Sequence, residues 1–153
     1  MIQPKIDYGI SVWGYCSDAN RRLIVRLQHR AARIITGNMD YVNTRGENLV
    51  KELGWQSIEN RRDYFTAVLM YRCINEIAPR RLIDGLVMTS ETHELHTRST
   101  ANKTVQVPEP KCELFRNSFR YQGALLWNRL PSYLQNASDI HSFKRLYKMH
   151  YFK

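Results

Sequence analysis

The chain has 153 residues, of which 43% are hydrophobic and 24% charged, a composition typical of a folded domain and not of a disordered segment. Lysine and arginine outnumber aspartate and glutamate by 23 to 14, so the formal net charge of +9 favours an acidic partner, nucleic acid before an anionic membrane surface. No run approaches the roughly 20 apolar residues that span a bilayer, the N-terminus has no secretory pattern, and three scattered cysteines argue against a disulfide framework, so we expect an intracellular protein without a membrane partner.

The first segment, residues 2–13, is open to two interpretations. Ile6, Ile10 and Trp13 recur at helical spacing, which favours a short buried helix. The alternation that runs through Ile6, Tyr8, Ile10 and Val12 would also suit a strand.

The next segment predicts a helix that carries a row of arginines. Ser17 and Asp18 can cap its start, and Gly37 supplies a left-handed stop after Thr36. Four arginines lie four, four and three residues apart and so share one side of this helix: Arg22, Arg26, Arg30 and Arg33. A neighbouring arc is apolar, and we expect it to be buried: Leu23, Leu27, Ala31 and Ile34.

A guanidinium row suits phosphate, because the planar fork can hold two oxygens and keeps its charge. The alternative for the same row is a solvated basic face with no ligand. The sequence therefore makes Arg22, Arg26, Arg30 and Arg33 candidate nucleic-acid contacts.

The remaining elements are mostly helical. Helices are expected at about 45–53, 58–77, 121–130 and 138–149, with a helical turn at 82–88. The polar stretch 89–104 indicates an exposed connection, and 104–107 a brief extended segment.

Together these elements predict a mainly α protein, a small helical bundle of about five to seven helices with an irregular, partly extended middle segment. Residues 1–88 would form one helical region, 89–112 an exposed connection and 113–153 a C-terminal helical segment, within one compact unit.

The C-terminal helix interleaves cations with aromatic rings. Lys144, Arg145 and Lys148 alternate with Tyr147 and Tyr151, a pattern that can hold phosphates and stack bases. Alternatively, the rings belong to the core and the cations extend outward to water.

The residues give little support to catalysis. The 14 acidic residues form no Asp-Asp or Asp-x-Asp pair, and neither a glycine-rich phosphate loop nor a Gly-x-Ser-x-Gly turn is present. His93 and His96 are three residues apart, but a zinc site would need a second close pair. We expect no catalytic residue, no metal and no cofactor.

A series of phrases occurs in a fixed order along the chain. It includes Leu27-Gln28-His29-Arg30-Ala31-Ala32-Arg33-Ile34-Ile35-Thr36-Gly37, then Leu53-Gly54-Trp55, and later Leu126-Trp127-Asn128-Arg129-Leu130-Pro131. The series resembles the C-terminal part of reverse transcriptases of animal non-LTR (LINE-type, jockey-like) retrotransposons, namely the end of the thumb and the helical segment after the polymerase.

The resemblance implies a fragment of an RNA-directed DNA polymerase that lacks the catalytic palm, since the family's aromatic-Ala-Asp-Asp motif is absent. Such a fragment is not expected to polymerise. Its expected partners are RNA, DNA or an RNA–DNA hybrid, held through the phosphate backbone, and the missing palm and fingers. The alternative is a protein-interaction helical module with no nucleic-acid role, anchored by Trp13, Trp55 or Trp127.

Overall fold

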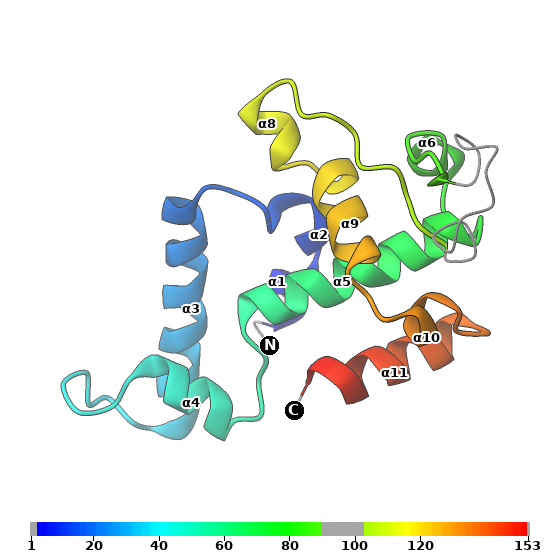
Figure 1. Cartoon of the computed structure of the whole chain (residues 1–153). Helices are drawn as coiled ribbons and strands as arrows, with labels where there is room; N and C mark the ends of the chain where they lie inside the picture. Colours follow the sequence, from blue (N-terminus) through cyan, green and yellow to red (C-terminus); the bar gives the residue numbers. More distant parts are fainter. Residues whose placement is uncertain (1–2, 90–102, 153) are drawn as a thin grey trace. The chain divides into compact units, whose positions relative to one another are not determined.

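The computed structural model describes residues 3–89 and 103–152 (Figure 1). In these ranges the backbone is helical, apart from loops and one antiparallel bridge between Met88 and Val105. The predicted mainly α class is confirmed. His93, His96 and most of the predicted 89–104 connection lie outside the described residues.

The chain divides into two compact units, Met1–Arg62 and Asp63–Lys153, here called the N-terminal unit and the C-terminal unit. The boundary lies within α5 (Ile58–Ile74) and does not coincide with the predicted segments 1–88, 89–112 and 113–153. The division falls there because α5, from Tyr64 onward, supplies side chains to the core of the C-terminal unit.

The N-terminal unit begins with two short helices, α1 (Gln3–Asp7) and α2 (Ile10–Trp13). Gly9 separates them with φ +66°, a left-handed conformation that other residues rarely adopt. The helical interpretation of this segment is therefore correct and the strand is wrong, although the helix is broken in the middle.

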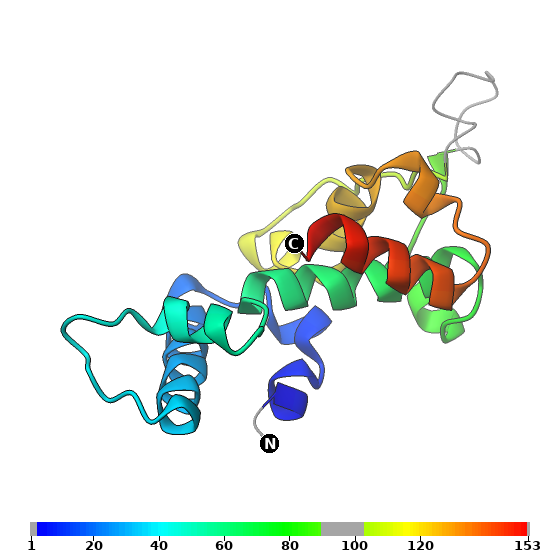
Figure 2. The same cartoon turned by 90° about the horizontal axis from the view of Figure 1, so that it is seen from below.

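Helix α3 (Asp18–Thr36) ends at Gly37, where φ is +68°, as predicted from the sequence. Helix α4 (Gly46–Glu52) lies beside it in both views (Figures 1 and 2). Between the two helices is a small apolar cluster in which half-buried residues surround three buried ones: Ala32, Leu49 and Val50, with Leu53 and Trp55 around them.

The apolar arc of α3 is not buried as predicted. Leu23 and Leu27 are each 55% exposed and Ile34 63%, and Ala31 is half-buried. The helix instead buries Gln28, Ala32 and Arg33. This face is the one that packs because the small Ala32 lets α4 approach closely, and because both polar side chains find backbone carbonyls.

Helix α5 begins at Ile58, the predicted residue, and the hydroxyl of Ser57 before it accepts a hydrogen bond from the Asn60 backbone N–H at 3.1 Å. It ends at Ile74, three residues before the predicted end. There the Ile77 N–H donates to Arg72 O and the Glu76 N–H to Cys73 O, a Schellman motif with Glu76 left-handed at φ +58°.

An aromatic cluster forms the core of the C-terminal unit. Tyr71 of α5, Trp127 of α9 (Phe119–Asn128) and Phe143 of α11 (Ile140–Tyr151) are almost fully buried together. Ring centroids are 4.7 Å apart for Tyr71 and Phe143, and 6.0 Å for Trp127 and Phe143. In both views α9 and α11 lie beside α5 (Figures 1 and 2).

Polar groups around this cluster are paired. The Trp127 indole N–H donates to Lys103 O at 2.5 Å, and the Asn128 amide both donates to Val105 O at 2.7 Å and accepts from its N–H at 3.0 Å. The predicted extended segment near 104–107 is thus held by side chains from α9.

The described ranges of the C-terminal unit also contain three shorter helices: α6 (Arg80–Ile83), α8 (Glu113–Arg116) and α10 (Ser132–Gln135). None of the helices in the described ranges is long and apolar enough to cross a membrane.

Candidate nucleic-acid interface

Three of the four predicted arginines of α3 form an exposed row. Arg22, Arg26 and Arg30 are exposed, and successive members are separated by about 6 Å along the helix axis, so the row spans about 12 Å. Within the described part of the chain, no carboxylate forms an ion pair with any of them. We call these three residues the arginine row.

Arg21 shows the contrast on the same helix. It pairs with Asp18 at 2.7 Å and lies 3.7 Å from a carboxylate oxygen of Glu59. Its charge is therefore largely neutralised inside the protein, whereas the arginine row keeps its charge available to solvent.

Arg33, the fourth predicted contact, is buried, has a structural role and is not part of the exposed row. Its side chain is buried, and the residue is only 5% exposed. The guanidinium donates to Asp40 O at 2.8 Å, to Thr44 O at 2.5 Å and to Asn38 O at 3.4 Å. Because these carbonyls use its donors, Arg33 holds the 38–44 loop and has no free fork for phosphate.

The 38–44 loop is also ordered from within. The Asp40 carboxylate accepts the backbone N–H of Asn43 at 2.9 Å and that of Val42 at 3.0 Å, and it accepts the Asn43 side-chain amide at 3.0 Å. These bonds, led by the one from the Asn43 backbone, hold the pKa of Asp40 below its usual value. The loop thus presents its remaining side chains in a fixed arrangement.

Tyr41 lies beside Arg33 in the candidate interface, and no pattern in the sequence selects it. The Arg33 guanidinium carbon lies 4.2 Å from the centroid of its ring, yet the residue is 67% exposed. The only signal in the sequence is the turn-forming set Asn38, Asp40 and Asn43, which predicts a turn but not which ring the turn presents.

The loop and the two helices enclose a depression of about 380 Å³. Its lining residues come from α3, the loop and the start of α4: Arg26, His29, Arg30, Arg33, Tyr41 and Gly46. The His29 ring packs directly on Gly46, where an added Cβ would lie 2.5 Å from the ring. Burial lowers the pKa of His29, Glu47 opposes this shift and Arg33 adds to it, so the imidazole is neutral at pH 7.

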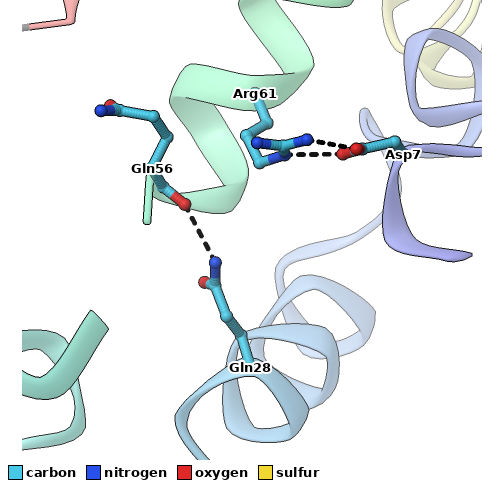
Figure 3. Close-up of polar contacts among 4 residues, drawn as sticks. All are labelled: Asp7, Gln28, Gln56 and Arg61. Atoms are coloured by element: carbon cyan, nitrogen blue, oxygen red, sulfur yellow. Dashed lines mark hydrogen bonds and ion pairs between the residues drawn. The ribbon is translucent and has the colours of Figure 1, made fainter. Parts of the chain in front are cut away.

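Two polar contacts of the N-terminal unit join α3 to Gln56, just before α5, and α1 to the first turn of α5 (Figure 3). The Gln28 side-chain amide donates to Gln56 O at 2.9 Å. The Arg61 guanidinium makes a two-pronged ion pair with Asp7, with Nε 2.6 Å from Oδ1. Arg61 is consequently not available as a further phosphate contact.

The second predicted set lies on α11, in the C-terminal unit. Arg145 and Lys148 are exposed and Lys144 is half-buried. Tyr147 is buried in the core, and the Lys148 ammonium lies 5.4 Å from the Tyr64 ring centroid. For Tyr147, the ring belongs to the core; Tyr151 stays partly exposed, at 40%.

Among the described residues, no three histidine, cysteine, aspartate or glutamate side chains are placed to hold a metal ion. Of the three candidate tryptophan anchors, Trp127 lies fully in the core, while Trp13 and Trp55 are half-buried. Comparison of the chain with protein-family models, with curated proteins and with solved structures finds no match.

Proposed function

We propose that this chain binds the phosphate backbone of nucleic acid and does not catalyse a reaction by itself. One observation carries the proposal: Arg22, Arg26 and Arg30 are exposed in one row with no carboxylate partner in the described ranges, whereas Arg21, Arg33 and Arg61 of the same unit are all engaged. The charge of the arginine row is therefore available to an anionic partner.

The spacing of the row supports a polyanion over a single anion. Its length of about 12 Å corresponds to the axial rise of three to four nucleotides of one strand. Contacts of this kind position a nucleic acid without selecting its sequence.

We also propose that the chain corresponds to the thumb end and following helical segment of a non-LTR retrotransposon reverse transcriptase. The support is the ordered series of phrases in the sequence. In this proposal the arginine row contacts the backbone of the template–primer duplex, while catalysis belongs to a palm whose carboxylate motif this chain does not contain.

The salt dependence of binding tests the proposal. We would measure the affinity for a 12-base-pair duplex by fluorescence anisotropy across a salt series. Replacing the arginine row by glutamine (Arg22→Gln, Arg26→Gln, Arg30→Gln) should reduce the slope of log affinity against log salt by about 2 to 3.

A matched control removes the same charge elsewhere. Lys51→Gln, Arg80→Gln and Arg116→Gln replace exposed cations outside both candidate sets and also lower the net charge by three. The control should leave the slope nearly unchanged. Equal slopes for wild type and the arginine-row variant would refute the proposal.

The α11 set is tested separately because it lies in the other unit. Arg145→Gln with Lys148→Gln should reduce the slope by about 2 if both residues contact phosphate. An unchanged slope would restrict the interface to α3.

A second candidate function is the binding of an acidic amphipathic helix from a partner protein. The observation that favours it is the exposed apolar side of α3, where Leu23, Leu27 and Ile34 run beside the arginine row. Charge complementarity selects an acidic helix, because a second copy of this chain, at +9, would bring like charges together.

The two candidates respond differently to the same experiment. A helical peptide with a leucine stripe flanked by glutamates should bind α3 in 0.5 M salt, and Leu23→Gln with Leu27→Gln should abolish its binding. Backbone binding should instead be lost at that salt concentration and be indifferent to the leucine substitutions.

A further inference from the structure

We propose that the depression beside α3 binds one unpaired nucleotide of a single strand, with its base on the outer face of Tyr41 and its phosphate on Arg26 and Arg30. This inference rests on the proposed function, because the phosphates of the flanking nucleotides would follow the arginine row. It adds a specific site and a preference for unpaired nucleic acid.

Only one face of the Tyr41 ring is available for a base to stack on. The Arg33 guanidinium covers the other face, 4.2 Å from the ring centroid, and is itself fixed by the carbonyls of Asn38, Asp40 and Thr44. The ring is therefore held in place before any ligand arrives, which lowers the entropy cost of stacking a base on it. The exposed fraction of 67% leaves the outer face open.

The lining of the depression matches the parts of a nucleotide. Arg26 and Arg30 supply two cations for a phosphate, Tyr41 supplies a π face, and the neutral His29 ring supplies a hydrogen-bonding group for a base edge. The volume of about 380 Å³ is within the range of small-molecule sites, and none of the six lining residues is acidic.

An unpaired base is required by this geometry. A base within a duplex has both faces covered by its neighbours, so it can reach Tyr41 only after leaving the stack, at a cost in unstacking and unpairing. A single strand has no such cost, and aromatic stacking accepts any base. The site should therefore favour single strands with little sequence preference.

The test compares strands with and without bases. Fluorescence anisotropy would measure binding of a 12-nucleotide oligothymidylate and of a strand of equal length whose central residues are abasic, at one salt concentration. Both strands carry the same phosphates, so stacking predicts that wild type binds the oligothymidylate roughly 5- to 100-fold more tightly. Equal affinities would overturn the inference without the need for any variant.

Substitutions then place the effect at Tyr41. Tyr41→Leu should remove the preference for bases and leave the affinity for the abasic strand unchanged, while Tyr41→Phe should keep the preference. Val42→Ala changes an exposed neighbour in the same loop and should have no effect. A base preference that persists in Tyr41→Leu would overturn the inference.

The measurements distinguish failure of the stacking site from failure of the proposed function. Duplex binding that depends on the arginine row, together with equal affinities for the two strands, would retain the proposed function and remove the stacking site. Absence of binding to every strand and duplex would remove both. Displacement of the oligothymidylate by an equal concentration of thymidine monophosphate would assign the depression to a free nucleotide and overturn the single-strand site.

Discussion

The two units bury their side chains in different ways. In the C-terminal unit, Tyr71, Trp127 and Phe143 stack in a closed aromatic core whose neighbouring polar groups are paired. In the N-terminal unit, the cluster between α3 and α4 has only Ala32, Leu49 and Val50 at its centre. Helix α3, the longest helix in the described ranges, thus makes a small apolar contact, supplemented by the hydrogen bonds of Gln28 and Arg33.

This difference shows which unit has side chains that are available to bind a partner. The buried face of α3 consists of Ala32 and the polar side chains of Gln28 and Arg33. This leaves the arginine row, with Leu23, Leu27 and Ile34, in solvent. The side chains of the C-terminal core are already used for folding. A helix with two uncovered faces, one cationic and one apolar, is available for a partner.

The largest expected effect tests the closed core. Trp127→Ala should destabilise the C-terminal unit by roughly 3 to 5 kcal/mol, because it leaves a cavity and removes the hydrogen bond to Lys103 O. Leu27→Ala on α3 should change stability by less than about 0.5 kcal/mol, since Leu27 is exposed. Urea unfolding followed by circular dichroism measures both, and similar losses would contradict the contrast between the units.

The next effect concerns the loop beside α3. Arg33→Gln should destabilise the N-terminal unit by about 1 to 3 kcal/mol, because the carbonyls of Asp40 and Thr44 lose their donor. Hydrogen exchange of the amides in residues 38–44 should accelerate with it. Arg30→Gln, one helical turn away and exposed, is the matched control and should alter neither quantity. Unchanged exchange in Arg33→Gln would mean that the loop orders itself through Asp40 alone.

The sequence predicts those helix starts and ends that depend on residues close together in the chain. Gly37 marks the end of α3, and α5 begins at Ile58, as the sequence predicts. Each of these features depends on a few residues that are neighbours in the sequence, so it can be predicted without the three-dimensional structure.

The face that α3 buries could not be predicted in the same way. Hydrophobicity favours Leu23 and Leu27, but burial depends on what the neighbouring segments offer to the helix. Gln56 O, just before α5, accepts the Gln28 amide, and the carbonyls of the 38–44 loop accept the Arg33 guanidinium. For the candidate site, spacing correctly grouped the arginine row but included Arg33, because the loop that recruits it is visible only in three dimensions. Tyr41 was missed for the same reason.

A substitution where α5 ends should increase the stability of the C-terminal unit. Glu76 adopts φ +58° where α5 ends, a conformation that costs free energy for any residue with a Cβ. Glu76→Gly should therefore stabilise the C-terminal unit by about 0.5 to 1 kcal/mol, measured as a higher urea midpoint. Glu52→Gly, at the right-handed end of α4, should be destabilising by a similar amount. A loss of stability in Glu76→Gly would show that its side chain has a role that outweighs the strain.

The smallest expected effect is a loss of stability at acidic pH, and it should appear in both units. The Asp139 carboxylate at the start of α11 accepts the backbone N–H groups of Ser142 and His141 and the hydroxyls of Ser142 and Ser138. These bonds, led by the one from the Ser142 backbone, hold the pKa of Asp139 well below its usual value.

Because the folded state binds this proton less readily than the unfolded state, the stabilisation is complete above about pH 5 and declines as the pH falls below it. Asp40 should act in the same direction in the N-terminal unit, since its pKa is lowered too. Asp139→Asn keeps a good N-cap but does not titrate, so it should change stability little at pH 7 and flatten the decline of the C-terminal unit between pH 5 and pH 2. Asp40→Asn should leave that decline intact and slow the acid-induced increase in hydrogen exchange of the 38–44 loop. If Asp139→Asn leaves the acid decline of the C-terminal unit unchanged, other carboxylates dominate it, and the cap of α11 does not couple that unit to pH.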